Sequence, residues 1–139
     1  MKKNESLKHI MTTGPRTITL LDSLSSARAI FLELGGHHLP VVEGKKLIGL
    51  LSYTDLQRID SGELYKQDPK QADVLLDNLS SIKETMTKNL ITLSSIDSVR
   101  DATDILANNS FHSVPIVDND ELVGIVTSTD LLRYYLKAY

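Results

Sequence analysis

Two stretches of the chain carry apolar residues at the spacing of one helix face, and each stretch follows an aspartate–serine pair. The spacing i, i+3, i+4, i+7 places such residues on one side of an α-helix. The pairs are Asp22-Ser23 and Asp97-Ser98, whose side-chain oxygens can accept from the free N–H groups that begin a helix. The apolar positions are Ala27, Ile30, Phe31 and Leu34 in the first stretch, and Ala102, Ile105 and Leu106 in the second. The pattern therefore predicts an N-capped amphipathic helix in each stretch.

Two continuous apolar runs, joined by a short polar turn, follow each predicted helix. The runs are 39–42 and 47–51 after the first predicted helix, and 114–117 and 122–126 after the second. They do not alternate with polar residues, which is typical of strands covered on both faces. The turns have the length of a hairpin connection. Pro40 and Pro115 cannot donate to a β-ladder, so we expect them near a strand start or at an open edge.

The same order of elements is predicted twice. A short strand at 17–20 or 91–93 precedes each helix, and a second helix begins at Thr54-Asp55 or Thr129-Asp130. Residues 10–59 and 85–134 align at a constant offset of 75, with 16 identities in 50 positions. Such self-similarity indicates one structural unit used twice. We therefore expect an α+β fold of two strand–helix–strand–strand–helix repeats, 8–60 and 83–137, packed about a pseudo-two-fold axis with a cleft between them. The connector, 61–82, is more polar and is expected to be partly helical.

The composition narrows the classes of function. A net charge of -3 and a pI near 5.7 argue against a chain that neutralises nucleic-acid phosphates. There is no cysteine, which excludes disulfides and thiolate chemistry and suits the cytoplasm. No run approaches the roughly 18 apolar residues of a membrane span. The adjacent His37-His38 pair lacks a third ligand at helical spacing, so no metal site is expected. No nucleophile, base and oxyanion-stabilising group can be combined, and the sequence therefore argues against an enzyme.

The residue order in both copies resembles the CBS domain (cystathionine β-synthase domain). An apolar residue, proline and two aliphatic residues precede a polar turn, and Leu-Ile/Val-Gly and Thr-Asp-Leu follow it, at 39–56 and again at 114–131. The segments 10–12 and 85–87 resemble the opening of the same domain. Two such repeats are similar to a CBS pair, or Bateman module, and no catalytic domain accompanies them, as in a stand-alone member. The resemblance implies a regulatory module that binds AMP, ADP, ATP, S-adenosylmethionine or a cyclic dinucleotide, needs no cofactor, forms a homodimer and signals to an unidentified protein partner.

The candidate chemistry lies in the motif at 49–55 and its sibling at 124–130. The motif predicts a strand that ends where a helix starts, and free N–H groups there favour a phosphate. Asp55 and Asp130 can each accept from two vicinal ribose hydroxyls, and the resemblance assigns them this role. It assigns the Ser or Thr three residues earlier to ribose or phosphate. The ribose and phosphate candidates besides the aspartates are Ser52, Thr54, Thr127, Thr129, His37, His112 and Arg16.

An adenine is expected between the first and second strands of each repeat. Its candidate neighbours are Thr17, Ile18, His38, Leu39 and Pro40 in the first repeat, and Thr92, Leu93, Ser113, Val114 and Pro115 in the second. Main-chain groups of His38 and Ser113 would contact the base edge. Other interpretations remain open: the motif residues only cap a helix, the apolar residues are plain core, or the chain is a structural dimerisation module whose cleft binds nothing. Substitutions between the copies predict unequal sites, of which the one at Asp130 is expected to be the better.

Overall fold

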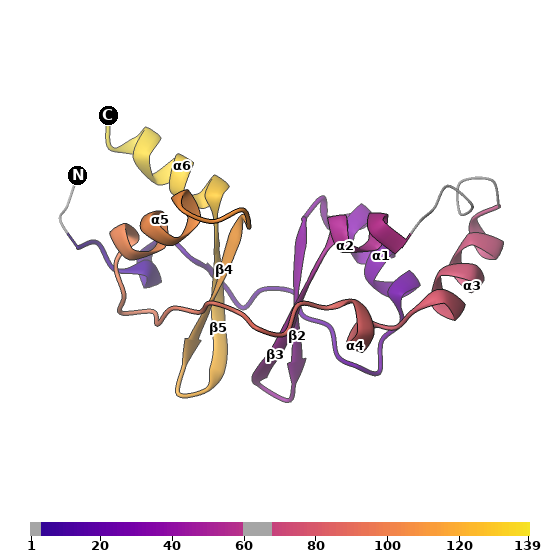
Figure 1. Ribbon diagram of the computed structural model, residues 1–139. Coiled ribbons are helices and arrows are strands. Elements are labelled where there is room, and N and C mark those ends of the chain that lie inside the picture. Colours follow the sequence, from indigo (N-terminus) through magenta and orange to yellow (C-terminus); the bar gives the residue numbers. More distant parts are fainter. Residues whose placement is uncertain (1–3, 60–67) are drawn as a thin grey trace. The chain divides into compact units, whose positions relative to one another are not determined.

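The computed structural model describes residues 4–59 and 68–139, in which helices and β-hairpins follow one another in the predicted order (Figure 1). The first repeat contains α1 (Leu24–Leu34), β2 (His38–Glu43), β3 (Lys46–Ser52) and α2 (Tyr53–Ile59). The second repeat contains α5 (Val99–Ala107), β4 (Ser113–Asp118), β5 (Glu121–Thr127) and α6 (Ser128–Lys137). The remaining elements are η1 (Leu7–His9), β1 (Thr12–Thr13), α3 (Pro69–Leu79) and α4 (Ile82–Thr85). The fold is α+β, as predicted, and part of the predicted connector, with Gly62, lies outside the described residues.

The chain forms two compact units, and each unit combines segments that are distant in sequence. Of the described residues, the terminal unit contains 4–15, 45–47 and 90–139, and the middle unit contains 16–44, 48–59 and 68–89. The terminal unit therefore holds most of the second repeat together with the segment that opens the first. The middle unit holds most of the first repeat together with the segment that opens the second.

Each opening segment supplies a fully buried residue to the unit that holds the other repeat. Leu7, from η1, is 0% exposed in the core of the terminal unit, beside Val99 and Ile116. Ile82, from α4, is 1% exposed in the core of the middle unit, beside Val41. The packing of the opening segments is therefore reciprocal: the segment that opens each repeat packs into the core of the unit that holds the other repeat.

The two repeated glycines allow this close approach. A Cβ at Gly124 would lie 2.7 Å from Met11 Sδ and 2.9 Å from the Thr12 carbonyl oxygen. A Cβ at Gly49 would likewise collide with the side chain of Met86. Each glycine thus leaves room for the methionine of an opening segment, because closer packing than van der Waals contact is destabilising.

The β-hairpins agree with the sequence prediction, whereas the short first strands do not extend. β4 and β5 pair antiparallel from Ser113↔Thr127 to Asp118↔Glu121, and β3 is the neighbour of β2. The segments predicted as strands at 17–20 and 91–93 form single parallel bridges, Ile18↔Val41 and Leu93↔Ile116. The physical reason is a turn that follows each bridge. In this turn the Asp22 or Asp97 carboxylate accepts from a backbone N–H three residues earlier, which ends the extended segment.

The helix starts show which member of each aspartate–serine pair is the N-cap. Ser23 accepts from the Ser26 N–H at the start of α1, and Ser98 accepts from the Asp101 N–H at the start of α5. At α5 the Asp101 carboxylate also accepts from the Ser98 N–H, which completes a capping box. The serines are therefore the caps, and the aspartates before them close the preceding turns.

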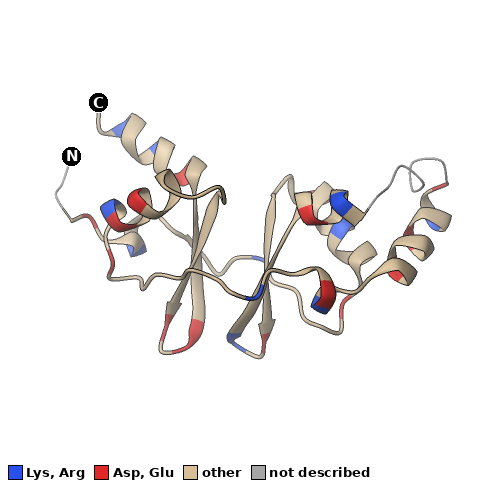
Figure 2. Cartoon of the chain, viewed as in Figure 1, with Lys and Arg blue, Asp and Glu red and all other residues tan. Residues whose placement is uncertain are grey.

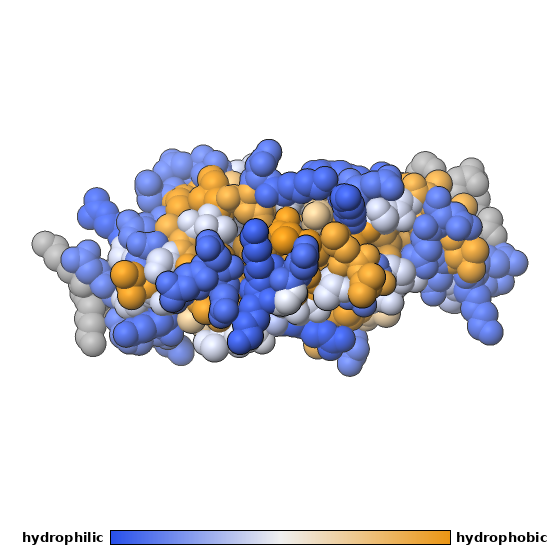
Figure 3. Space-filling model, turned by 90° about the horizontal axis from the view of Figure 1, so that it is seen from below, coloured by the Kyte–Doolittle hydropathy of each residue, from blue (hydrophilic) through white to orange (hydrophobic). Residues whose placement is uncertain are grey.

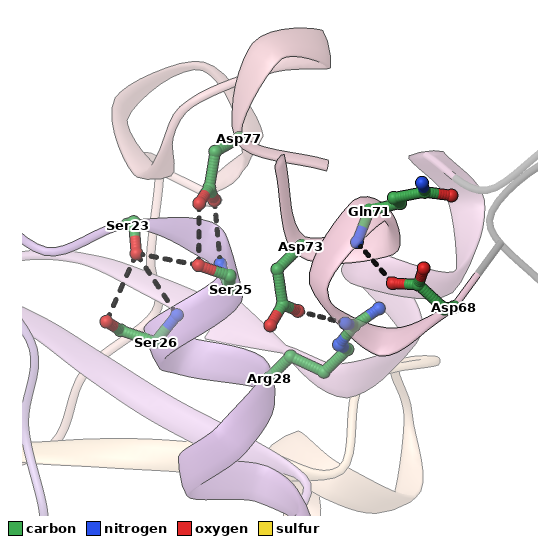
Figure 4. A network of polar contacts seen from close by, with 8 residues as sticks. All are labelled: Ser23, Ser25, Ser26, Arg28, Asp68, Gln71, Asp73 and Asp77. Carbon is green, nitrogen blue, oxygen red and sulfur yellow. Dashed lines mark hydrogen bonds and ion pairs between the residues drawn. The ribbon is translucent and has the colours of Figure 1, made fainter. Parts of the chain in front are cut away.

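A network of polar contacts attaches α3 to α1 within the middle unit (Figure 4). The Asp77 carboxylate accepts from the Ser25 N–H at 2.9 Å and from the Ser25 hydroxyl at 2.6 Å. Arg28 of α1 forms an ion pair with Asp73 of α3. Leu76 of α3 is buried in the same unit at 1% exposure. The connector helix, 11 residues long in the structure, is thus part of the middle unit rather than a free linker.

The two hairpin turns differ in charge, with lysines on the β2–β3 turn and acidic residues on the β4–β5 turn (Figure 2). Lys45 and Lys46 are exposed, as expected of solvated charges. At the end of β4, the Asp118 carboxylate accepts from the hydroxyls of Ser94 and Ser95 and from the Ser95 N–H. Hydrogen bonds from Ser95, then from Ser94, lower the pKa of Asp118. The carboxylate therefore attaches the first bridge segment of the second repeat to the end of β4.

We expect Asp118→Asn to remove one part of the acid sensitivity of folding. A carboxyl whose pKa is lowered by folding stabilises the protein above its unfolded pKa of about 3.9, and this contribution is lost as pH falls through the folded pKa. Urea unfolding of both proteins between pH 7 and pH 2.5 measures the effect. The variant should be less stable at pH 7, and the difference should shrink below about pH 4. A difference that stayed constant to pH 2.5 would show that the Asp118 charge contributes nothing.

Within residues 4–59 and 68–139, no helix combines the length and the apolar character needed to cross a bilayer.

Candidate strand–helix junction site

In the terminal unit, β5 ends at Thr127 and α6 begins at the next residue, so that a capping box lies at the junction. The Thr127 hydroxyl accepts from the Asp130 N–H at 3.1 Å, and Asp130 Oδ2 accepts from the Thr127 N–H at 2.9 Å. Asp130 Oδ1 has no hydrogen bond or ion pair with any residue in 4–59 or 68–139. One carboxylate oxygen therefore maintains the cap while the other is available to a ligand.

The middle unit repeats this junction with one difference. The Ser52 hydroxyl accepts from the Asp55 N–H at 3.0 Å, and Asp55 Oδ2 accepts from the Ser52 N–H at 2.9 Å. Asp55 Oδ1, however, lies 3.7 Å from Arg58 Nη1. The Arg58 side chain is 77% exposed, so this ion pair is screened by water and is worth little.

The repeated histidines lie at these junctions. The His37 carbonyl accepts from the Tyr53 N–H at 2.9 Å, and the His112 carbonyl accepts from the Ser128 N–H at the same distance. Both histidine side chains are exposed. The start of each second helix is therefore fastened to the residue before the hairpin's first strand. The structure thus brings His37 to the Ser52–Asp55 junction and His112 to the Thr127–Asp130 junction.

The remaining candidates for a phosphate contact are Thr54, Thr129 and Arg16. Thr54 and Thr129 are exposed in the first turns of α2 and α6, beside the capping aspartates. Arg16 is exposed and forms no ion pair within the described ranges of the chain. Sequence reasoning placed it near one site only, and no contact in the structure attaches it to the Ser52–Asp55 junction.

The residues predicted to contact the adenine lie on two segments in each repeat, and backbone hydrogen bonds join these two segments. Ile18 donates to the Pro40 carbonyl at 3.0 Å and accepts from the Val42 N–H at 2.9 Å. Leu93 does the same with Pro115 and Val117, at 3.1 and 2.8 Å. The aliphatic side chains of the first pair belong to the core, since Ile18 is 1% and Leu39 is 3% exposed. The other predicted neighbours divide into buried Pro40, Val114, Pro115 and Ser113 and more accessible Thr17, His38, Thr92 and Leu93.

The hydroxyl of Ser113 is a feature that sequence reasoning did not find. Ser113 is 3% exposed, and its Oγ atom has no hydrogen-bond partner within the described ranges. The sequence predicted only main-chain contacts for this residue. The available signal was a polar side chain at the start of the apolar run 114–117, in a position that the first repeat gives to His38.

A capping box alone does not define a site, as α5 shows. Ser98 and Asp101 form the same pair of hydrogen bonds, at 3.0 and 3.1 Å, at the start of a helix that follows a turn. Hydrogen bonds from the Ser98 backbone and hydroxyl lower the pKa of Asp101. What distinguishes Thr127–Asp130 is its place at a strand end, next to His112. The N–H groups of Thr127, Ser128 and Asp130 are already paired there, so the exposed side chains of His112 and Thr129 are the groups that can meet an anion.

The comparison with family models decides the assignment. The model for the CBS domain matches residues 7–62 and again residues 80–137. The chain belongs to the CBS domain family. The match covers both repeats, as the sequence resemblance predicted.

Comparison with known proteins shows how much of the chain each likeness covers. The chain is 28% identical over 134 residues to inosine-5'-monophosphate dehydrogenase of Korarchaeum cryptofilum, covering 94% of this chain and 24% of that protein. The CBS domain pair of protein MJ0100, solved with 5'-methylthioadenosine and S-adenosyl-L-methionine, has a TM-score of 0.78 and 27% identity and covers 99% of this chain and 100% of the other. CBSX2 of Arabidopsis thaliana has a TM-score of 0.82 at 21% identity, over 98% and 97% of the two chains. The chain thus spans about a quarter of the curated dehydrogenase but all of the MJ0100 CBS pair.

Proposed function

We propose that this chain is a regulatory module that binds an adenosine-containing ligand, with the Thr127–Asp130 junction as the principal site. The observation that carries the proposal is the available Asp130 Oδ1 atom beside the capping box. Two vicinal ribose hydroxyls can donate to this carboxylate, and hydrogen bonds to a charged acceptor are roughly twice as strong as neutral ones. The Ser52–Asp55 junction is the second site, which we expect to be weaker because the residues beside it differ between the repeats, with Tyr53 in place of Ser128.

Two observations support an adenosine-containing ligand. The CBS pair of MJ0100, at 27% identity, is in complex with two adenosyl ligands. In this chain, the exposed His112 and Thr129 side chains beside the α6 N-terminus suit a phosphate or another polar group at the 5' position. AMP, ADP, ATP and S-adenosylmethionine all fit this description. The enzyme activities of the relatives do not transfer, because the proposed site offers binding groups rather than a nucleophile and a base.

We place the base against the bridge segment and the hairpin strand of each repeat. Leu93 and Pro115 are joined directly by a backbone hydrogen bond, so a base packs on the pair of segments instead of separating them. Ile18 and Pro40 of the middle unit are joined in the same way but are both buried, so the more accessible Thr17 and His38 are the predicted neighbours that a base can reach there. Apolar residues of this kind line both cores and ligand pockets.

Regulation then depends on a difference in affinity. A ligand shifts a conformational equilibrium only as far as it binds one state better than the other. We propose that the adenosyl ligand favours one conformation of the module, and that a protein partner recognises that conformation.

Thermal denaturation with a panel of ligands tests this function. AMP, ADP, ATP, S-adenosylmethionine, 5'-methylthioadenosine and a cyclic dinucleotide are each added at rising concentration. A ligand at 100 times its Kd should add about 2.7 kcal/mol to the free energy of unfolding. GMP serves as the control for non-specific phosphate binding. If no adenosyl ligand raises the melting temperature beyond GMP, the sensor function is wrong.

A structural dimerisation module is the second candidate, and exposed apolar side chains favour it. Leu132 and Leu136 of α6 are 69% and 75% exposed, and Leu32 of α1 is 68% exposed. Apolar side chains also reach the surface between hydrophilic ones in the view of Figure 3. Such residues often mark interaction surfaces when they are contiguous. A dimeric mass in analytical ultracentrifugation, together with no response to any ligand in the panel, would support this candidate over the sensor.

A further inference from the structure

Met11 and Met86 occupy equivalent positions in the two opening segments, and each packs its sulfur atom against a glycine. A Cβ at Gly124 would lie 2.7 Å from Met11 Sδ and 3.0 Å from Met11 Cγ. A Cβ at Gly49 would collide with Met86 Sδ and lie 3.0 Å from Met86 Cγ. Between each sulfur atom and its glycine there is therefore no room for one further heavy atom, because overpacking of this kind is destabilising.

Both thioethers remain within reach of a small oxidant. The Met11 side chain packs against the core of the terminal unit and that of Met86 against the core of the middle unit, yet both residues are partly exposed. The sequence has no cysteine, so the thioethers are the only sulfur atoms that an oxidant meets. Each methionine thus combines access from solvent with a close fit on one side.

Each methionine also stands next to the backbone pairing that holds its opening segment. Met11 directly precedes β1, which pairs antiparallel with β5. Met86 directly precedes Thr87, whose N–H donates to the Leu50 carbonyl at 2.9 Å and whose carbonyl accepts from the Leu50 N–H at 3.0 Å. A change that pushes either methionine away from its glycine therefore also strains a short stretch of pairing. The strands affected, β5 and β3, are the two that end at the candidate junctions.

We propose that Met11 and Met86 are reversible oxidation sites, at which a peroxide converts the thioether to a sulfoxide and loosens the opening segments. The O–O bond of the peroxide breaks, and one of its oxygen atoms forms a bond to Sδ. Sulfur loses two electrons, and hydrogen peroxide is reduced to water. The product is a larger, polar side chain at an apolar contact, where a buried polar group is costly without a hydrogen bond.

Reversal needs a reductant of known class. Methionine sulfoxide reductases return the sulfur to the thioether, with one enzyme for each sulfoxide epimer. The oxygen atom leaves as water, and a dithiol supplies the two electrons and becomes a disulfide. The two sites thus give the chain a response to oxidants that does not depend on the adenosyl ligand proposed above.

Hydrogen peroxide treatment of the purified chain tests the proposal. Peptide mapping by mass spectrometry should find one added oxygen atom on Met11 and on Met86. The melting temperature should fall by at least about 4 °C, because overpacking costs about 1–3 kcal/mol at each site. Hydrogen exchange should become faster in peptides that contain residues 10–13 and 85–88. Incubation with both sulfoxide reductases and a dithiol should restore the melting temperature.

The matched control is the double variant Met11→Leu/Met86→Leu, which nearly conserves volume but has no sulfur to oxidise at these positions. It retains Met1 and therefore reports any effect of oxidation there. Peroxide should leave the melting temperature of the double variant at its own untreated value. If the double variant does not fold, each single variant takes its place and should show only the loss caused by the remaining methionine.

Four results would overturn the proposal. In the first, Met11 and Met86 stay unmodified at a peroxide concentration that oxidises N-acetylmethionine completely. In the second, both are oxidised but the melting temperature does not change. In the third, the double variant loses as much stability as the wild-type protein, and in the fourth, the reductases do not reverse the loss. None of these results depends on whether the chain binds an adenosyl ligand, so the proposed function is tested separately.

Discussion

Asp130→Asn is expected to weaken AMP binding by at least about 10-fold. The asparagine retains an oxygen that can accept from the Thr127 N–H, so the helix cap is largely preserved. It removes the negative charge that strengthens hydrogen bonds from the ribose hydroxyls. Hydrogen bonds to a charged group contribute about 1.5–3 kcal/mol each, and 1.4 kcal/mol corresponds to a tenfold change in Kd. Fluorescence or calorimetric titration of the purified variant measures the change.

Asp101→Asn is the matched control, because Asp101 has the same role in the capping box of α5. Both substitutions alter one capping carboxylate in the same unit, and both should therefore have similar, small effects on unfolding. Only Asp130→Asn should reduce affinity. If the two variants bind AMP equally well, the Thr127–Asp130 junction is a helix cap and nothing more. Asp55→Asn should have a smaller effect, since we expect its site to be the weaker one.

Leu7→Ala is expected to lower the free energy of unfolding by about 2–5 kcal/mol, the usual cost of truncating a leucine in a core. Leu7 is 0% exposed in the core of the terminal unit although it lies close to the N-terminus. Ile82→Ala should have a cost of the same order in the middle unit, where Ile82 is 1% exposed. Urea denaturation followed by circular dichroism measures both changes.

Two exposed aliphatic residues, Leu21 and Ile96, provide the controls. Leu21 is 98% exposed and Ile96 is 80% exposed, so Leu21→Ala and Ile96→Ala should each change stability by less than about 0.5 kcal/mol. A loss below about 1 kcal/mol for Leu7→Ala would contradict the reciprocal packing of the opening segments.

The sequence predicted the hairpins and helices because their signals are local. A serine followed by a helical apolar stripe, or two aliphatic runs around a polar turn, has the same meaning wherever it occurs. The partner of each opening segment could not be predicted in this way. Met11 and Met86 occupy equivalent positions in the repeat, and either could pack on Gly49 or Gly124 as far as pattern is concerned. Only the three-dimensional structure shows that each packs on the repeat to which it does not belong.

The candidate site could be predicted only in part, because some of its contacts are local in the sequence and others are not. The spacing of Thr127 and Asp130 indicates a capping box, and the structure has its two hydrogen bonds. The role of Asp118 was missed, because its serine partners lie more than 20 residues earlier and no local pattern connects them. The unpaired Ser113 hydroxyl was missed because burial of one side-chain atom depends on the packing of the whole fold.

A crystal structure of the chain in complex with AMP tests the central claim most directly. The account predicts that the ribose hydroxyls lie within hydrogen-bond distance of Asp130 Oδ1, and that the phosphate lies at the start of α6. A ligand bound elsewhere on the chain, or an Asp130 carboxylate that contacts only the Thr127 N–H in the complex, would contradict it.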